Sequence, residues 1–247
     1  MKLSVITIAY NNLNGLKKTL ALFGEAFAPD LVEVVVVDGN SDDGSKAFLE
    51  SQSISRVWVS EPDKGIYNAM NKGLAMASGD YVWFLNSGDY VESRETIEAI
   101  LEALKANPDA VYGETMMVDA DGRHLGTRSE ISTRRLPEKL TWKSFRYGMN
   151  VGHQSFIIKR RLAKPYNESY RYVADIDWMI ASLKDCRQVV NLGRVIACFS
   201  VDGFSSVQRS KSNQERYRVL RLHYGFVPNL LAHLYIVLRK ICARKRL

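Results

Sequence analysis

Two spacings of apolar residues follow one another in the first part of the chain. Residues 3–10 form a short β-rich run, and a nearly continuous β-branched run follows at 32–37, as in a strand buried on both faces. Between them, apolar residues recur every three or four positions, which predicts one buried helical face: Leu13, Leu16, Leu20, Phe23 and Phe27. The pattern predicts strand, helix and strand in that order.

The same alternation continues to about residue 110. A short helix is expected at 46–51, a strand at 56–59, a helix at 66–77, a strand at 81–85 and a helix at 93–106. Strands and helices in this order favour an open, mostly parallel sheet flanked by helices, with right-handed crossovers. We therefore predict an α/β fold.

The second half has a different order of elements. We expect a hairpin turning at 119–122, a strand at 153–158, a helix at 175–183 and strands at 188–191 and 195–200. No Pro-, Gly- or Ser-rich linker interrupts the chain. We predict one domain over residues 1–205, divided into a nucleotide-binding half (1–110) and an acceptor-side half (111–205), followed by a helical tail at 206–247.

Composition and charge narrow the functional classes. With 247 residues, 46% of them hydrophobic, the chain is neither disordered nor fibrous. Its three cysteines lie far apart, which disfavours a disulfide framework or a zinc site and fits a reducing compartment. The net charge of +7 combines +9 after residue 208 with −2 before it, so the body lacks the basic surface of a nucleic-acid-binding protein.

Polar residues gather where the predicted parallel strands end, which is where open α/β sheets bind ligands. These loops contain Ala9-Tyr10-Asn11, then Asp38, then Asp63-Lys64-Gly65, and then Asn86-Ser87-Gly88-Asp89. No G-x-G-x-x-G or P-loop pattern occurs, so neither common phosphate-binding loop is supported.

Four segments in this order resemble family 2 glycosyltransferases: residues 4–11, 36–45, 61–73 and 84–89. The sequences of these segments are similar to those of the branch of the family that builds bacterial exopolysaccharides such as colanic acid. The resemblance implies the GT-A fold, a nucleotide-diphosphate sugar donor, a divalent metal (Mg²⁺ or Mn²⁺) and inversion at the anomeric carbon.

The resemblance assigns donor binding to the strand-end loops, namely Ala9, Tyr10, Asn11, Asp38, Asp63, Lys64, Gly65, Asn86, Ser87 and Gly88. Asp38 matches the acid that reads the base or ribose, since a carboxylate accepts hydrogen bonds from either. Asp38 as a cap of its own turn is the alternative. For Lys64 the alternative is a solvated surface position.

Asp89 matches the metal-binding position, where the family commonly has several acids and this chain has one. One carboxylate suffices when the ion is shared with the donor's phosphates. The alternative is that Asn86-Ser87-Gly88-Asp89 only turns the chain.

Asp175 matches the general base that deprotonates the acceptor hydroxyl, with Asp177 as its rival. Two residues apart at the start of a helix, the two acids point in different directions. Either could instead favour the helix dipole. On the acceptor or phosphate side, the resemblance adds His153, Gln154 and Ser205, although a lone histidine before an apolar run can be structural.

The tail combines an apolar helical stripe with a basic end. Its apolar stretch is too short and too polar to span a bilayer. Lying on an anionic membrane fits better, and packing on the body or on a dimer partner is the alternative. The stripe consists of Val227, Leu230, Leu231, Leu234, Leu238 and Ile241, and the basic end of Arg239, Lys240, Arg244, Lys245 and Arg246.

We therefore expect a cytoplasmic, membrane-peripheral, inverting glycosyltransferase acting on a lipid-linked glycan in bacterial surface polysaccharide synthesis. The alternatives are a metal-dependent nucleotidyltransferase and a non-catalytic nucleotide-sugar-binding protein.

Overall fold

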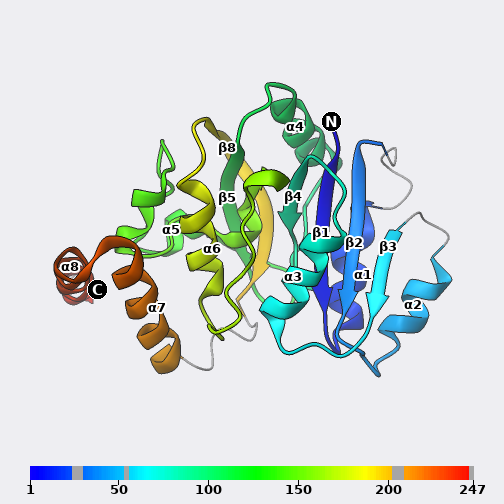
Figure 1. The fold of residues 1–247 in the computed structure, drawn as a ribbon, viewed down its shortest axis with the longest axis horizontal. Helices are drawn as coiled ribbons and strands as arrows, with labels where there is room; N and C mark the ends of the chain where they lie inside the picture. The colour runs from blue at the N-terminus through cyan, green and yellow to red at the C-terminus, as the bar shows by residue number, and fades with distance from the viewer. Residues whose placement is uncertain (24–29, 53–55, 202–208, 245–247) are drawn as a thin grey trace.

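The computed structural model describes residues 1–23, 30–52, 56–201 and 209–244. In these residues the strands form one sheet in the order β3-β2-β1-β4-β7-β5-β6, with β8 paired to β5 (Figure 1). The strands are β1 (Leu3–Ala9), β2 (Val32–Asp38), β3 (Arg56–Ser60), β4 (Tyr81–Phe84), β5 (Ala110–Val118), β6 (His124–Thr127), β7 (Phe156–Lys159) and β8 (Val189–Ser200).

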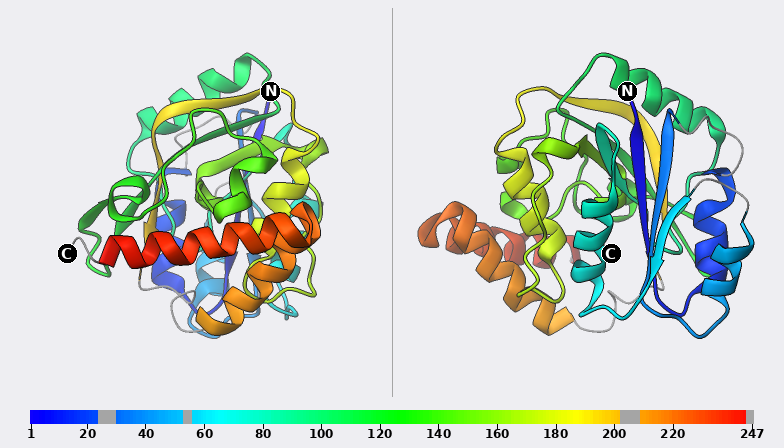
Figure 2. Two further views of the ribbon diagram at one scale, coloured as in Figure 1. Left: turned by 90° about the vertical axis from the view of Figure 1, so that its left-hand side faces the viewer. Right: turned by 45° about the vertical axis from the view of Figure 1, so that its right-hand side comes forward.

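Helices cover both faces of the sheet (Figures 1 and 2). They are α1 (Leu13–Leu20), α2 (Ser45–Ser51), α3 (Ile66–Met76), α4 (Arg94–Lys105), α5 (Arg128–Ile131), α6 (Ala174–Leu183), α7 (Arg209–Tyr224) and α8 (Phe226–Arg244). Successive residues of β1 point to opposite faces. Ile6 joins the core that contains Met70 of α3, whereas Val5 joins the core that contains Leu16 of α1.

The first half of the sheet is parallel. Strand β1 pairs in parallel with β2 and β4, and β2 pairs in parallel with β3. The carboxyl ends of β1 to β4 therefore meet at one edge. The predicted α/β class and mostly parallel sheet are confirmed, with antiparallel pairs where β7 meets β4 and β5 and where β6 meets β5.

Two predicted elements of the second half have other bounds in the structure. His153–Ser155 is a 3-10 turn closed by the Ser155 N–H, which donates to the Gly152 carbonyl, and β7 starts only at Phe156. The two strands expected at 188–191 and 195–200 are one strand, β8, whose register with β5 shifts near Glu114. An apolar run predicts burial, and residues 153–155 are buried, but it did not distinguish a strand from a buried turn.

The C-terminal helices pack against the body. Val219 and Leu220 of α7 are fully buried in the main core, and α8 contacts α7 and the 3-10 helix Trp142–Tyr147. In the described part of the chain no helix is long and apolar enough to cross a bilayer. The division into domains stays a prediction.

Candidate active site

A pocket of about 1040 Å³ opens at the edge where β1 to β4 end. Its walls come from the loops after these four strands, from the start of α3, and from residues 168–171 before α6. Parallel pairing places all four loops together. Among the predicted donor-binding residues, those on its wall are Ala9, Tyr10, Asp63, Lys64, Gly65, Asn86 and Ser87.

A close approach of three residues shapes one wall of the pocket. The Gly65 N–H donates to Asp63 Oδ1 over 2.7 Å, which fixes the Asp63 carboxylate. A Cβ added at Gly39 would lie 2.7 Å from Asp63 Oδ2 and 3.1 Å from Cδ2 of Tyr10. Only glycine at position 39 leaves room for both side chains. Tyr10 remains 67% exposed, with its ring available to a ligand.

Asp38 is buried at the end of β2 and lies off the pocket wall. Its Oδ2 accepts hydrogen bonds from the Ser41 N–H (3.0 Å) and the Ser60 hydroxyl (2.7 Å), and its Oδ1 accepts one from the Ser41 hydroxyl. Asn11 also lies behind the wall, where its N–H donates to Ser41 Oγ. These contacts match the turn cap that we weighed for Asp38, and they hold the loops after β1, β2 and β3 together.

The turn after β4 presents two oxygen groups that could hold a cation. Asp89 is only 8% exposed, and this burial raises the pKa of its carboxyl to about 7. Asn86 Oδ1 is buried without a hydrogen-bond partner. Gly88 supports the turn with a φ of 105° and an N–H that donates to Thr19 Oγ1. In the described ranges no group of three or more His, Cys, Asp or Glu could hold a metal alone. The turn therefore fits a divalent ion whose remaining ligands come from a substrate.

Asp175 stands in the first turn of α6, next to a residue of the pocket wall but not part of that wall itself. Tyr67, on the pocket wall, places its hydroxyl against the backbone of Ala174 and Asp175. Burial raises the pKa of the Asp175 carboxyl, while the Ile176 N–H and the charges of Arg216 and Arg128 oppose that rise. A carboxylate with a raised pKa is a better proton acceptor near neutral pH.

Asp177 points elsewhere. Its Oδ1 is 2.7 Å from Nε2 of His223 on α7, and both side chains are largely buried. The first turn of α6 thus holds two acids with separate surroundings: Asp175 is near Tyr67 of the pocket wall, and Asp177 is paired with His223.

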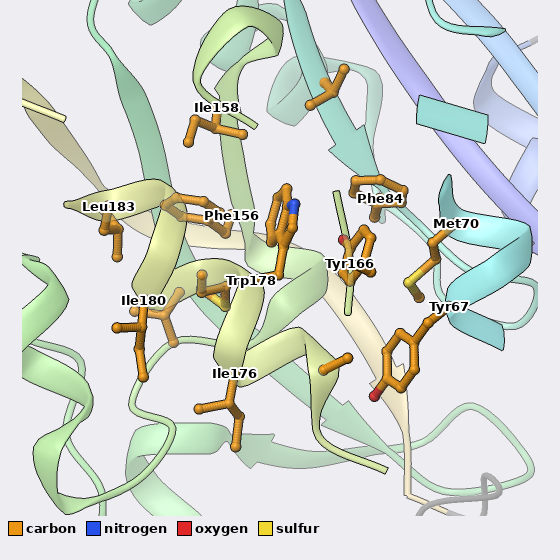
Figure 3. Packing of buried hydrophobic residues seen from close by; sticks show 14 of the residues in the cluster. Tyr67, Met70, Phe84, Phe156, Ile158, Tyr166, Ile176, Trp178, Ile180 and Leu183 are labelled. Atoms are coloured by element: carbon orange, nitrogen blue, oxygen red, sulfur yellow. The ribbon is translucent and has the colours of Figure 1, made fainter. Parts of the chain in front are cut away.

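His153 belongs to an aromatic cluster, and Figure 3 shows three other members of this cluster, Phe84, Tyr166 and Trp178. Its ring packs against Phe84, Tyr166 and Trp178, and its Nε2 is 2.6 Å from the Tyr166 hydroxyl. Burial lowers the pKa of His153 to about 4, so the imidazole is neutral at pH 7.

The neighbouring Gln154 is also buried, and its backbone carbonyl accepts a hydrogen bond from Trp83 Nε1. Neither His153 nor Gln154 is on the pocket wall. Ser205, the third residue expected on the acceptor side, lies outside the described residues.

One pocket residue that sequence reasoning missed is Glu168. Its carboxylate accepts hydrogen bonds from Asn68 Nδ2 (3.0 Å) and Asn71 Nδ2 (2.8 Å) of α3. Asn71 also makes two hydrogen bonds to the backbone of Tyr166: its Nδ2 donates to the Tyr166 carbonyl, and its Oδ1 accepts from the Tyr166 N–H. These bonds fasten the segment before α6 to α3. Two asparagines one turn apart on a predicted helix were the available signal.

A comparison with known families gives the identity. The sequence profile of Glycosyl transferase family 2 matches residues 4–164. The chain belongs to this family and is a glycosyltransferase. The matched segment contains all four strand-end loops and stops before Asp175. The family, the enzyme class and the GT-A fold expected from the motifs are thereby confirmed.

Curated relatives carry the same class of name. An uncharacterized glycosyltransferase of Mycobacterium tuberculosis (strain ATCC 25618 / H37Rv) is 29% identical over 241 residues, which cover 94% of this chain and 89% of the relative. The Escherichia coli protein WfgD, named a UDP-Glc:alpha-D-GlcNAc-diphosphoundecaprenol beta-1,3-glucosyltransferase, is 25% identical over 213 residues, covering 85% of this chain and 80% of WfgD.

Solved structures show the same fold. Residues 1–349 of S. aureus TarS in complex with UDP-GlcNAc superpose with a TM-score of 0.69 at 20% identity, covering 90% of this chain and 65% of that one. The chain thus spans slightly less than two thirds of the TarS fragment. The mannosyltransferase PcManGT from Pyrobaculum calidifontis, in complex with GDP-Man and Mn²⁺, gives a TM-score of 0.68 at 17% identity, covering 95% of this chain and 69% of that one.

Proposed function

We propose that this glycosyltransferase transfers one sugar, with inversion, from a nucleotide-diphosphate sugar to a lipid-linked glycan in bacterial surface polysaccharide synthesis. The observation that carries the proposal is the position of Asp175, which is next to Tyr67 in the wall of a large pocket built from strand-end loops and has no ion-pair partner of its own in the described chain. Such an arrangement suits a transferase and is not required of a nucleotidyltransferase or a non-catalytic binder.

The nucleoside occupies the wall formed by the loops after β1 and β3. The exposed Tyr10 ring offers a stacking surface for the base, and the Asp63 carboxylate accepts hydrogen bonds from the base or ribose. Lys64 adds a positive charge at the rim, and Gly65 allows the ligand to approach the backbone closely. Asp38 supports this wall from behind through Ser41 and Ser60.

Asp89 and Asn86 Oδ1 would hold a divalent ion, Mg²⁺ or Mn²⁺. The ion, when bound, offsets the negative charge that develops on the departing diphosphate. Asp89, with its raised pKa, is a poor isolated ligand, so we expect the ion and the nucleotide to bind together. PcManGT, a neighbour in fold, was solved with both Mn²⁺ and GDP-Man.

Asp175 acts as the general base. The acceptor hydroxyl gives its proton to the Asp175 carboxylate, the oxygen forms a bond to the anomeric carbon, and the bond from that carbon to the diphosphate breaks. Attack from the side opposite the leaving group inverts the centre. The Tyr67 hydroxyl, against the backbone at Asp175, helps to position the start of α6 relative to the donor pocket.

The outer face of α8 supports a position at a membrane. Phe226, Val227, Leu230, Leu231 and Leu234 are each at least half exposed on this helix, whereas Asn229 and Ala232 are buried beneath it. The basic residues that follow in the sequence suit anionic lipid. The side chains of Leu238, Ile241 and the basic end lie outside the described residues. We propose that α8 lies on the cytoplasmic membrane surface and places the enzyme beside its lipid-linked acceptor.

Sedimentation with phosphatidylglycerol vesicles tests the membrane contact. The wild-type chain should sediment with these vesicles, and the variant L230E/L234E should remain in the supernatant with its melting temperature unchanged. If both proteins stay in solution, the proposal that α8 contacts the membrane fails. This result would not bear on the proposal for donor binding.

Calorimetric titration with UDP-, GDP- and dTDP-sugars, each with and without Mn²⁺, tests the donor proposal. One nucleotide should bind in the micromolar range and more weakly when Mn²⁺ is removed. Binding of none of them would contradict the proposed function.

A further inference from the structure

Two arginines from distant parts of the chain flank Asp175. Arg128 is the first residue of α5, and Arg216 lies in the middle of α7. Their charges act on the pKa of the Asp175 carboxyl and on each other, which places all three groups together. In Figure 2, α7 passes below α6, and α6 contacts α7 directly.

Both guanidinium groups are incompletely satisfied. The Nε–H of Arg128 and the Nε–H of Arg216 are buried and have no hydrogen-bond acceptor. Arg128 Nη2 donates to the Met149 carbonyl over 3.1 Å, and Arg216 Nη1 makes only a 3.5 Å contact with Asn213 Oδ1. A buried donor without an acceptor is rare in native proteins and calls for an explanation, such as a bound water, ion or ligand.

No carboxylate fills this role. Among the described residues, neither Arg128 nor Arg216 has an ion pair within 4.0 Å, although the charges of Asp175 and Glu114 act on Arg128. Burial lowers the pKa of both guanidiniums, so both positive charges are held at a cost. Two planar, five-donor groups whose charges act on each other and on Asp175 fit a group with several anionic oxygens, as in a phosphate or diphosphate.

We propose that Arg128 and Arg216 bind the phosphate or diphosphate group of the acceptor and so hold its hydroxyl at Asp175. Neither arginine lines the donor pocket, which favours the acceptor over the donor as the source of the phosphate. The helix that carries Arg216 also packs against α8, whose exposed apolar face would contact lipid. A diphosphate that carries a lipid on one side and a sugar on the other could contact all three places: the lipid at α8, the diphosphate at the arginines and the sugar at Asp175. The proposal rests on the proposed function and adds the chemistry of the acceptor.

The test uses the full chain and geranyl diphosphate, a soluble prenyl diphosphate, titrated in a calorimeter in the presence of saturating UDP and Mn²⁺. The wild type should bind it. Arg128→Gln and Arg216→Gln should each weaken this binding at least tenfold and leave the affinity for UDP unchanged. Arg218→Gln is the matched control, because Arg218 is an exposed arginine of the same helix and should leave both affinities unchanged.

The proposal would be overturned if the wild type did not bind geranyl diphosphate, or if the glutamine variants bound it as tightly as the wild type does. It would also be overturned if these variants lost as much affinity for UDP as for geranyl diphosphate, because the arginines would then belong to the donor's diphosphate. If a glutamine variant fails to fold, Arg128→Lys and Arg216→Lys keep the charge but lose the planar fork, and they should still weaken binding severalfold. Unweakened binding by the folded lysine variants would then contradict the proposal. Failure of the proposed function would instead appear as a wild type that binds no nucleotide.

Discussion

Nε2 of His223 lies 2.7 Å from Oδ1 of Asp177, which joins the first turn of α6 to α7. The other ring nitrogen of His223 is 3.0 Å from Lys184 Nζ. Nε2–H therefore donates to Asp177 while Nδ1 accepts from the ammonium group. In the described part of the chain Asp175 has no such ion-pair partner, which favours Asp175 over Asp177 for the proposed role of general base.

Asp177→Ala should lower stability and spare catalysis. It leaves a largely buried imidazole N–H without an acceptor, which costs about 1–3 kcal/mol of the free energy of unfolding. Urea denaturation measures this loss, and transfer assays on the folded variant should give a kcat within a few-fold of wild type. A lost kcat at unchanged stability would move the base to Asp177.

Gly39→Ala should weaken donor binding without unfolding the protein. The new methyl group would meet the Asp63 carboxylate at 2.7 Å and push it out of the pocket wall. We expect a rise of roughly tenfold in the donor dissociation constant, equivalent to the loss of about one charge-assisted hydrogen bond. Calorimetry measures the affinity and a thermal melt checks the fold. Unchanged affinity would remove Asp63 from the nucleoside site.

Asp89→Asn should uncouple metal from nucleotide. The variant lacks the only carboxylate in the turn after β4, so Mn²⁺ should no longer tighten the binding of the nucleotide, and transfer should fall by at least a hundredfold. Asp42→Asn is the control, because Asp42 is an exposed acid at the same edge of the sheet but off the pocket wall. An Asp89→Asn variant that keeps the full Mn²⁺ effect would place the metal elsewhere.

Glu33 gives a prediction about pH. Burial alone would raise the pKa of this carboxyl, but hydrogen bonds from Ser78 and the charge of Lys2 outweigh it and lower the pKa below 4.5. A lowered folded-state pKa contributes stability above the unfolded-state value and loses it as the pH falls through the folded-state value. Glu33→Gln should therefore be less stable than wild type at pH 7, with a difference that shrinks below about pH 4.5. Urea unfolding between pH 7 and 3.5 measures this difference, and a constant gap would contradict the assignment.

The first half of the fold was predictable because its signals are local. The β-branched run of β2 and the three- and four-residue spacing before it required no knowledge of distant contacts. Parallel pairing then fixed where the loops meet, which is why Tyr10, Asp63 and Asn86 were expected together and line one pocket.

The acceptor side was less predictable because long-range packing decides it. His153 matched a family motif, but three aromatic rings from separate elements enclose it. Arg128 and Arg216 are 88 positions apart in the sequence, and no spacing rule relates them. Only the three-dimensional structure shows whether these arginines near Asp175 have hydrogen-bond acceptors.

The most direct test of Asp175 as the proposed base is single-turnover transfer by Asp175→Asn, with the donor affinity measured on the same preparation. The variant should bind the nucleotide sugar with wild-type affinity and transfer the sugar at least a thousandfold more slowly, the order of effect of a lost general base. Near wild-type transfer by a variant that still binds donor would show that Asp175 is not the base.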